Sequence, residues 1–455
     1  MTLVVGFMSL LDVTIVNVAL PSIQRGIDAS PQGLQWVISG YALTFGLVLV
    51  AGGRLGDIVG RRRMFLIGLA GFTATSALAG AAPNEELLVA ARLLQGVAAG
   101  MLTPQNTGLI QELFRGEERG RAFGVFGTTV GVSAATGPVL GGLIIALAGP
   151  EDGWRFVFLV NVPIGLAAMV LAARLIPRSR PVEGSVGRQL DPVGALLLGA
   201  TVLSVLLPLV QSMSDPVSSW WLMVLLAPAL AWAFTRWERH MIALDRSPLL
   251  DVRLVARAPG FATGVALQTV YFCGFSGLWL VLALFFQDGL GYSPLQSGLA
   301  VTPFAIGSAG TAVVAGRLVG RWGRRLTVTG LVLVTGGFTA LALTITAGEH
   351  TALSTAVPLL VAGIGSGAVI SPNITMTLTE VPPRMGGAAG GAIQTGARVG
   401  SAVGAAVLAA AFRISVEGLG YAGAAQAALV CAIGFVLVAL ALALWELRLQ
   451  RRREW

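Results

Sequence analysis

The chain contains fourteen apolar runs, each long enough to cross a lipid bilayer as a helix. A helix rises about 1.5 Å per residue, so about 20 residues span a hydrocarbon core of about 30 Å. The runs lie at 2–24, 34–53, 64–82, 87–109, 122–147, 156–176, 191–211, 219–237, 261–286, 295–316, 326–347, 353–377, 386–411 and 421–446. Turn-forming residues separate them, and Asp191 with Pro192 is a favourable helix start. We therefore predict an all-α polytopic membrane protein with fourteen transmembrane helices.

The composition excludes a soluble globular protein. Hydrophobic residues make up 55% of the chain and charged residues 11%, whereas soluble domains carry about 25% charged residues. The same hydrophobicity excludes disorder. The first run holds Asp12 in its middle and has no basic segment before it, so we expect a span and not a cleavable signal peptide. A truncated start would explain the missing cytoplasmic lead.

The formal charge of +8 comes from arginine alone and reports topology. Most arginines fall in alternate loops, around 54–63, 115–121, 174–188, 236–257, 317–325 and 448–453. The opposite loops carry mainly acids. By the positive-inside rule the arginine-rich side is cytoplasmic, so we expect both termini there, in the inner (plasma) membrane. We expect no nucleic-acid partner.

An internal repeat divides the chain. Gly53–Arg62 reads GRLGDIVGRR, and Gly316–Arg325, 263 residues later, reads GRLVGRWGRR. At the same offset Gly127, Gly137 and Gly141 fall on Gly390, Gly400 and Gly404. Parallel repeats are typical of transporters with two helical bundles. We predict six-helix bundles at 1–177 and 259–455, separated by 178–258, which holds linkers and an inserted helix pair at 191–237.

Six segments follow one another along the chain: LDVTIVNVALPSI (11–23), GRLGDIVGRRR (53–63), RLLQGVAAG (92–100), GTTVGVSAATGPVLGG (127–142), WRFVFLVNVPIG (154–165) and GYSPLQSGLAVTP (291–303). Together they resemble the major facilitator superfamily, in particular its fourteen-helix drug:proton antiporter family. The resemblance covers essentially the whole chain. It implies the major facilitator fold and proton-coupled drug export, and it implies no enzyme activity.

Asp12 and Arg92 are the candidates for proton coupling. Asp12 lies about 15 Å deep in the first span, and it is the only acid that we place deep in the membrane. Burial favours its neutral form, which a proton carrier needs in one of its states. Arg92, in the fourth span, could reach Asp12 or an anionic substrate, or snorkel outward. The alternative for Asp12 is a permanent ion pair that fixes helix packing. The resemblance implicates the counterpart of Asp12 in coupling.

The loop after the second span is the candidate conformational gate, with Gly53, Gly56, Asp57, Gly60, Arg61, Arg62 and Arg121. In the resembling family this motif latches the cytoplasmic ends in the outward-facing state. Asp57 has two possible partners, Arg121 or a helix N-terminus. The alternative is an ordinary positive-inside loop. Gly320 replaces the aspartate in the second repeat, so we expect a one-sided latch.

Small residues mark the fifth span as a close-packing helix: Gly127, Gly131, Gly137, Pro138, Gly141 and Gly142. Candidates for a substrate cavity between the bundles are Asn17, Trp36, Tyr41, Asn106, Gln268, Tyr271, Gln394 and Arg398. Each is, on its own, more commonly a helix–helix contact. Arg398 is also the candidate second-half partner of Arg92. No second buried carboxylate is expected in the C-terminal half, which favours a neutral, monocationic or amphipathic substrate.

Other chemistry has no support in the sequence. His240 and His350 lie far apart, so no metal site is expected, and no phosphate-binding loop for ATP occurs. We expect no cofactor. The leading hypothesis is a monomeric proton-coupled antiporter for drugs or amphipathic small molecules, a class linked to multidrug efflux and antibiotic resistance. The alternatives are an exporter of a metabolite, natural product or peptide, an uptake symporter, and a membrane sensor that does not transport.

Overall fold

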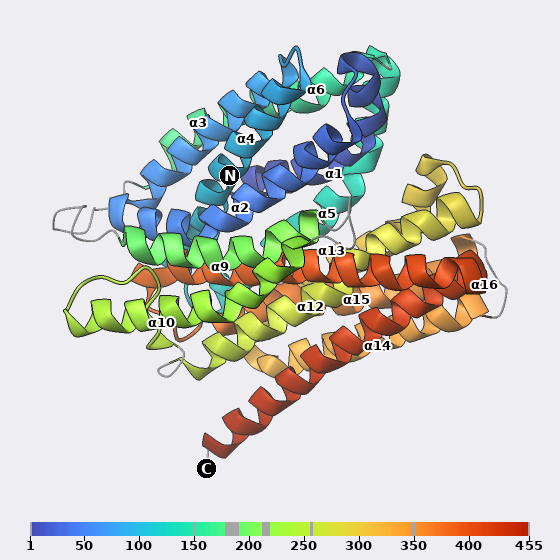
Figure 1. Ribbon diagram of the computed structural model, residues 1–455. Helices are drawn as coiled ribbons and strands as arrows, with labels where there is room; N and C mark the ends of the chain where they lie inside the picture. Colours follow the sequence, from blue (N-terminus) through green and yellow to red (C-terminus); the bar gives the residue numbers. More distant parts are fainter. Residues whose placement is uncertain are drawn as a thin grey trace. The chain divides into compact units, whose positions relative to one another are not determined.

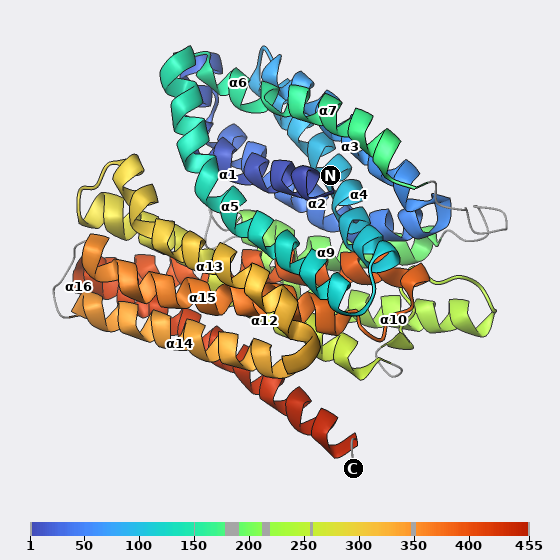
Figure 2. The same ribbon diagram turned by 180° about the vertical axis from the view of Figure 1, so that it is seen from behind.

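A computed structural model describes residues 2–149, 151–177, 191–211, 219–254, 258–346 and 352–453. All regular structure in these ranges is helical (Figures 1 and 2). The elements are α1 Thr2–Ile27, α2 Pro31–Val59, α3 Arg61–Gly80, α4 Glu85–Leu113, α5 Gly116–Ala148, α6 Gly153–Leu159, α7 Asn161–Leu175, α9 Pro192–Gln211, η1 Ser219–Leu226, α10 Ala227–Ala243, α12 Pro259–Leu284, η2 Phe285–Gly289, α13 Pro294–Trp322, α14 Arg324–Thr346, α15 Ala352–Thr377, η3 Pro383–Met385 and α16 Gly386–Arg453.

Eleven helices within the described ranges are long and apolar enough to cross a membrane. The number differs from fourteen at three places. The helix α16 counts once, although Gly420 interrupts it with a φ of 65°. The helix α5 contributes only the shorter apolar stretch Val139–Ala148, and η1 with α10 does not qualify. The exact count therefore stays a prediction, whereas the all-helical, multi-span architecture is confirmed.

Local sequence explains where several helices begin and break. Ser30 caps α2 by accepting a hydrogen bond from the Gly33 N–H at 3.0 Å, with Pro31 at the first helical position. Asp191 caps α9 in the same way through the Gly194 N–H at 2.8 Å. The predicted span at 156–176 is divided into α6 and α7, because Pro163 has no N–H to donate to the carbonyl one turn earlier.

The described residues form two compact units. The first comprises 1–113, 136–257 and 381–395, and in it α2 packs on α4 and α9 while α3 packs on α4 and α7. The second comprises 114–135, 258–380 and 396–455, and in it α15 packs on α13, α14 and α12. The domain limits that the sequence predicted, at residues 177 and 258, divide the chain into continuous segments, whereas each unit combines several segments. These limits stay predictions.

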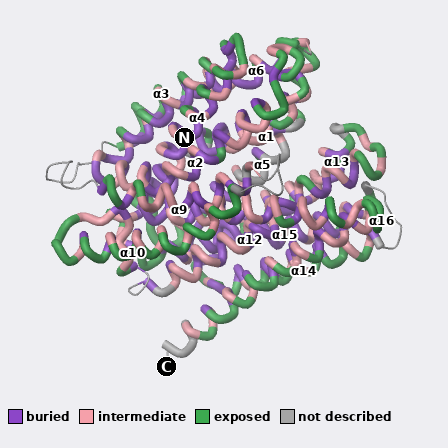
Figure 3. Tube along the Cα trace, viewed as in Figure 1, coloured by how far each residue is buried: buried purple, intermediate pink, exposed green. Residues whose placement is uncertain are grey.

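The exposed surface is apolar in many places. Leu147, Leu353 and Ile414 are 80%, 83% and 82% exposed, and Figure 3 shows exposed residues along the outer sides of many helices. In water such patches would favour association, whereas hydrocarbon solvates them. Polar groups such as Asp12 and Arg92 are instead buried inside the first unit. This distribution is that of a multi-pass membrane protein.

Candidate functional site: a buried network around Asp12

Asp12 is completely buried in the first unit, and three side chains donate hydrogen bonds to it. Arg92 Nη1 lies 2.6 Å from Oδ2, while Gln95 Nε2 and Asn161 Nδ2 lie 3.1 and 3.0 Å from Oδ1. Donors from α4 and α7 thus converge on a carboxylate of α1. The arrangement supplies the counter-charge and hydrogen bonds that a buried carboxylate requires.

Arg92 is held by several partners besides Asp12. Its Nε donates to the Val37 carbonyl at 2.9 Å, and its Nη1 also donates to Gln95 Oε1 at 2.7 Å. The guanidinium carbon stands 4.2 Å from the centre of the Tyr41 ring, a cation–π contact. The side chain is 1% exposed, so outward snorkelling is wrong and the Asp12–Arg92 contact is present.

Sequence reasoning missed two members of this network, Gln95 and Asn161. Gln95 follows Arg92 by one helical turn, so both project from one face of α4, and that spacing could have identified it. It also donates to Ser76 at 2.7 Å. Asn161 stands where α6 gives way to α7. The proline two residues later was the available signal for a polar group at a helix break.

Asp57 accepts hydrogen bonds from the backbone at the start of α16. The N–H groups of Gly387 and Ala388 lie 3.0 Å from its two oxygens, and Arg61 Nη2 lies 2.9 Å from Oδ1. A carboxylate at a helix N-terminus is favoured by the helix dipole and the free N–H groups. Of the two partners considered for Asp57, the structure therefore contains the helix N-terminus.

The other residues of this loop fix its shape. Arg61 also donates to the carbonyls of Gly108 and Pro383, and Arg62 donates to the Ala173 carbonyl. Gly60 ends α2 with a φ of 104°, which side-chain-bearing residues rarely adopt. A Cβ on Gly53 or Gly56 would collide with Gly387 or Gln105, respectively.

Arg121, the other residue considered for the latch, has a local ion-pair partner on α5. It lies in the second unit, where its nearest acid is Glu117 at 3.6 Å, one helical turn away. The side chains are 60% and 54% exposed, so this ion pair contributes little to stability. The alternative pairing of Asp57 with Arg121 stays a prediction.

A buried ion pair in the second unit corrects the expectation of a C-terminal half without a buried carboxylate. Arg324 Nη2 lies 2.7 Å from Glu446 Oε1, and the two side chains are 0% and 5% exposed. Arg324 also donates to Asn373 at 2.5 Å, and Thr263 donates to Glu446 at 2.7 Å. Glu446 ends an apolar run, where the pattern favoured a hydrated position. Since Arg324 neutralises it, the pair adds no net charge.

The predicted cavity residues have different surroundings. Gln268 accepts from Asn373 at 2.8 Å and Tyr271 donates to Ser366 at 2.8 Å, so both make helix–helix contacts. Tyr41 is buried under Arg92. Asn106 is 1% exposed, and its amide has no partner among the described residues. The rest are exposed or half-buried, namely Asn17, Trp36, Gln394 and Arg398, and their role stays a prediction.

The glycines of α5 differ in how closely they are packed. A Cβ on Gly137 would meet Thr14, one on Gly141 would meet Ile15 at 2.9 Å, and one on Gly127 would meet Ser371 at 3.2 Å. A Cβ on Gly142 would meet nothing within 4 Å among the described residues, so the predicted close packing has no support at that position. Gly131 and Pro138 belong to α5, but their surroundings lie outside the described residues.

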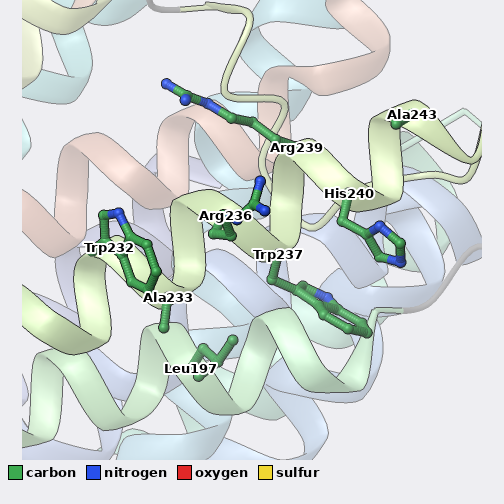
Figure 4. Close-up of a pocket in the computed structure, with 8 residues that line it drawn as sticks. All are labelled: Leu197, Trp232, Ala233, Arg236, Trp237, Arg239, His240 and Ala243. Carbon is green, nitrogen blue, oxygen red and sulfur yellow. The ribbon is translucent and has the colours of Figure 1, made fainter.

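A groove runs along α10 (Figure 4). Its lining residues are Leu197, Trp232, Ala233, Arg236, Trp237, Arg239, His240 and Ala243. No member of the network contributes to it. Within the described ranges there is no group of three or more side chains suited to hold a metal ion.

Comparisons with known proteins place this geometry in a family. The Major Facilitator Superfamily profile matches residues 2–405. The chain is 37% identical over 390 residues to a probable actinorhodin transporter of Streptomyces coelicolor, covering 85% of this chain and 67% of that protein. It is 35% identical over 395 residues to the puromycin resistance protein pur8 of Streptomyces alboniger, covering 85% and 75%.

A third relative is the drug efflux pump JefA of Mycobacterium tuberculosis, 33% identical over 391 residues, covering 85% of this chain and 74% of the pump. Among solved structures, the human organic anion transporter MFSD10 matches with a TM-score of 0.69 at 17% identity, covering 97% of this chain and 98% of that one. The proton:xylose symporter XylE matches at 0.67 and 14%, covering 97% and 94%. These two likenesses concern the fold alone. The chain belongs to the Major Facilitator Superfamily.

Proposed function

We propose that this protein exports drugs or other amphipathic small molecules from the cytoplasm in exchange for protons, by alternating access. The observation that carries the proposal is the complete burial of Asp12 near the middle of α1, where Arg92 balances its charge. A buried acid of this kind is costly in lipid and marks a functional site by default. Relatives whose names denote drug or antibiotic transport support the substrate class.

The contacts of Arg92 suggest how a proton would act. Arg92 keeps the Val37 carbonyl, Gln95 and the Tyr41 ring as partners when Asp12 becomes neutral. Protonation of Asp12 would therefore change the network from neutral to positive without displacing the guanidinium. A positive network disfavours a cationic substrate nearby, and a neutral one tolerates it. Proton binding from outside would thus favour substrate release, and proton loss to the cytoplasm would reset the site.

The complete burial of Asp12 can couple proton exchange to a conformational change. With no exposed surface in this structure, the carboxylate exchanges protons only after the surrounding helices separate, so exchange is tied to a conformational step. The contact of Asp57 with the start of α16 is the proposed latch for that step. It joins the end of α2 to residues 387 and 388 through charge-assisted hydrogen bonds.

The energetics permit antiport. A proton-motive force of about 150 mV supplies about 3.5 kcal/mol per proton. One-for-one exchange of a neutral compound would then sustain a gradient of roughly 300-fold. The arginine asymmetry supports a location in the inner (plasma) membrane with both termini in the cytoplasm. A monomer is part of the same proposal.

Natural-product export is the second candidate. It is favoured by the relative named as a probable actinorhodin transporter. The two candidates share a mechanism and differ in substrate range, so transport of several unrelated dyes and antibiotics would favour the drug exporter. Strict preference for one compound, such as actinorhodin, would favour the natural-product exporter. An uptake symporter is compatible with the fold, and the direction of the effective proton gradient separates it from an antiporter.

The test uses proteoliposomes with an imposed pH gradient, puromycin and ethidium as probe substrates, and a trapped pH indicator. We expect substrate-dependent proton movement and uphill substrate transport. Asp12→Asn should abolish both. The matched control is Asp152→Asn, because the Asp152 side chain is 71% exposed in its ion pair with Arg155. Full coupled transport by Asp12→Asn would remove Asp12 from the mechanism, and downhill transport without proton movement by the wild type would contradict antiport.

A further inference from the structure

Two buried carboxyl groups face each other at the inserted helix pair. Asp191 directly precedes α9, and Glu238 lies in α10, one residue past the predicted span at 219–237. The residues are 3% and 0% exposed. Asp191 Oδ2 and Glu238 Oε1 both lie closer than 3.0 Å to the point where a Cβ on Gly194 would stand. The two acids therefore converge on one small volume, which is open only because residue 194 is glycine.

The hydrogen bonds of the pair are unequal. Asp191 Oδ1 accepts from the Gly194 N–H at 2.8 Å and from Trp237 Nε1 at 2.9 Å. Its Oδ2 has no hydrogen-bond partner among the described residues, and neither has either oxygen of Glu238. The backbone N–H groups of Leu249 and Leu250 face Glu238 but make no hydrogen bond of normal geometry with it. A hydrogen bond between the two acids would give a partner to Asp191 Oδ2 and to one of the Glu238 oxygens.

Two carboxylates at this separation do not both ionise in a buried site, because like charges repel and burial penalises each charge. Asp191 has two donors and stands at the N-terminus of α9, so it is the better place for the negative charge. Glu238 has neither. Burial, and then the negative charge of Asp191, raise the pKa of Glu238 from 4.5 to about 8.

We propose that Asp191 and Glu238 form a proton-binding site separate from Asp12. In this site Glu238 carries the proton, and its protonated carboxyl group donates a hydrogen bond to Asp191 Oδ2. The proposal goes beyond proton-coupled export, since the site would exist whether or not Asp12 carries protons. Its ligand is one proton, gained and lost near neutral pH.

Other charged groups around the pair indicate what its protonation would affect. Arg54 on α2 interacts with Glu238, Asp191, Asp57 and Asp251, and its Nε has no hydrogen-bond partner in the part of the chain that the structure describes. Arg54 stands within one helical turn of Asp57, the residue at the proposed latch. A second negative charge on the pair would therefore strengthen its pull on an arginine next to that latch.

The remaining charges near the pair are otherwise engaged or exposed. Asp251 forms an ion pair with Arg253 at 2.8 Å. On α10 itself Arg236, Arg239 and His240 are exposed and line the groove of Figure 4. Packing joins the inserted pair to α2, because Phe234 belongs to one buried cluster with Val50 and Leu249. Loss of the proton from the pair would thus affect α2 through both its charge and its packing contacts.

The test is infrared spectroscopy of the purified protein without substrate, titrated from about pH 6 to about pH 10. We expect a carbonyl stretch of a protonated carboxyl group that disappears with a midpoint near pH 8. Glu238→Gln should remove this titrating band. Asp191→Asn should keep it and lower its midpoint, because the like charge is gone while burial remains. Absence of the band in the wild type, or its persistence in Glu238→Gln, would overturn the proposal.

Thermal unfolding gives a second readout. The pKa of Glu238 is raised in the folded protein, so the folded state keeps a proton that the unfolded chain releases between pH 4.5 and about 8. Stability should therefore fall as pH rises through this window, and Glu238→Gln should lose that part of the dependence. Equal pH profiles for wild type and variant would contradict the site.

Asp12→Asn is the matched control in both measurements, and it should keep the Glu238 band and the part of the pH dependence that Glu238→Gln loses. Neither measurement needs a substrate or a gradient. If the protein shows the Glu238 band but does not couple transport to protons, the proposed function is wrong and this site stands. If it couples transport to protons but shows no such band, the proposed function stands and this site is wrong.

Discussion

The Asp12–Arg92 pair is stabilised by more groups than its two charges. The carboxylate accepts from Arg92, Gln95 and Asn161, and the guanidinium also contacts Val37 and Tyr41. In a buried site the attraction of two charges roughly offsets their desolvation, so such additional bonds decide whether the pair is stable. Removal of one partner should therefore lower the free energy of unfolding by more than the intact pair contributes to it.

Arg92→Ala should lower the free energy of unfolding by about 3–5 kcal/mol, because it leaves the Asp12 carboxylate buried without a counter-charge. Combining it with Asp12→Asn should cost less than the sum of the single changes, since the double variant has no uncompensated charge. The measurement is thermal or denaturant unfolding of the purified protein in detergent.

Arg121→Ala is the control for this series. Its exposed pair with Glu117 should contribute no more than about 0.5 kcal/mol. If Arg92→Ala and Arg121→Ala were equally stable, the buried ion pair would not exist as described.

Residue-level prediction from sequence succeeded where depth alone decided the outcome. Asp12 and Arg92 both stand inside apolar runs, and an unpaired charge there is so costly that contact between them was one of the outcomes considered. Glu446 was missed because it ends its run and because Arg324 is 122 residues away in sequence. Long-range pairing of that kind leaves no local pattern. The acid pair at 191 and 238 was missed for the same reason.

At the scale of elements, equivalent glycines of the two repeats perform the same packing role. In the first unit Gly137 and Gly141 of α5 press on Thr14 and Ile15 of α1. In the second unit Gly400 and Gly404 of α16 press on Thr269 and Cys273 of α12. The fifth helix of each half thus packs closely on its first helix. Such small-residue contacts let helices approach in membranes, where no hydrophobic force drives them together.

Gly400→Ala should destabilise the protein by about 1–3 kcal/mol, because the added methyl group would overlap the Thr269 carbonyl oxygen, which belongs to the backbone and cannot rotate away. The matched control is Gly142→Ala, where nothing lies within 4 Å. Alanine is the better helix former there, and the repeat already has Ala405 at the equivalent position. Melting temperatures of the two variants provide the comparison. Equal losses would exclude close packing at Gly400.

Element boundaries show what periodicity and turn chemistry can and cannot predict. Apolar length predicted where helices lie, and Pro163 could have predicted the break between α6 and α7. The φ of 65° at Gly420 inside α16 was not predictable, because only one of the chain's many glycines adopts it in that helix. The 3₁₀ geometry of η1 also has no sequence signal that separates it from an α-helix.

For the molecule as a whole, the number of membrane spans depends on whether η1 and α10 together cross the membrane. A 3₁₀-helix rises about 2.0 Å per residue, so the eight residues of η1 cover more distance than they would as an α-helix. With the part of α10 up to Trp237, the length reaches about 32 Å, enough for a hydrocarbon core of about 30 Å. Tryptophans stand at both ends, at 220, 221 and 237, as in interfacial belts.

We therefore expect positions 188 and 215 to lie on opposite sides of the membrane. Alkaline phosphatase fused after Asp215 should be active, and the same fusion after Arg188 should be inactive, because the enzyme folds only outside the cytoplasm. Green fluorescent protein at the two positions should give the reverse pattern.

The reason for this expectation is that arginines flank the inserted pair at both of its chain ends, at 178–188 and at 236–257, and hold both ends on the cytoplasmic side. If the pair instead lay on the membrane surface, position 215 would report the same side as 188. The Asp191–Glu238 site would then lie on a surface-bound helix pair, and the count of fourteen spans would fall to twelve.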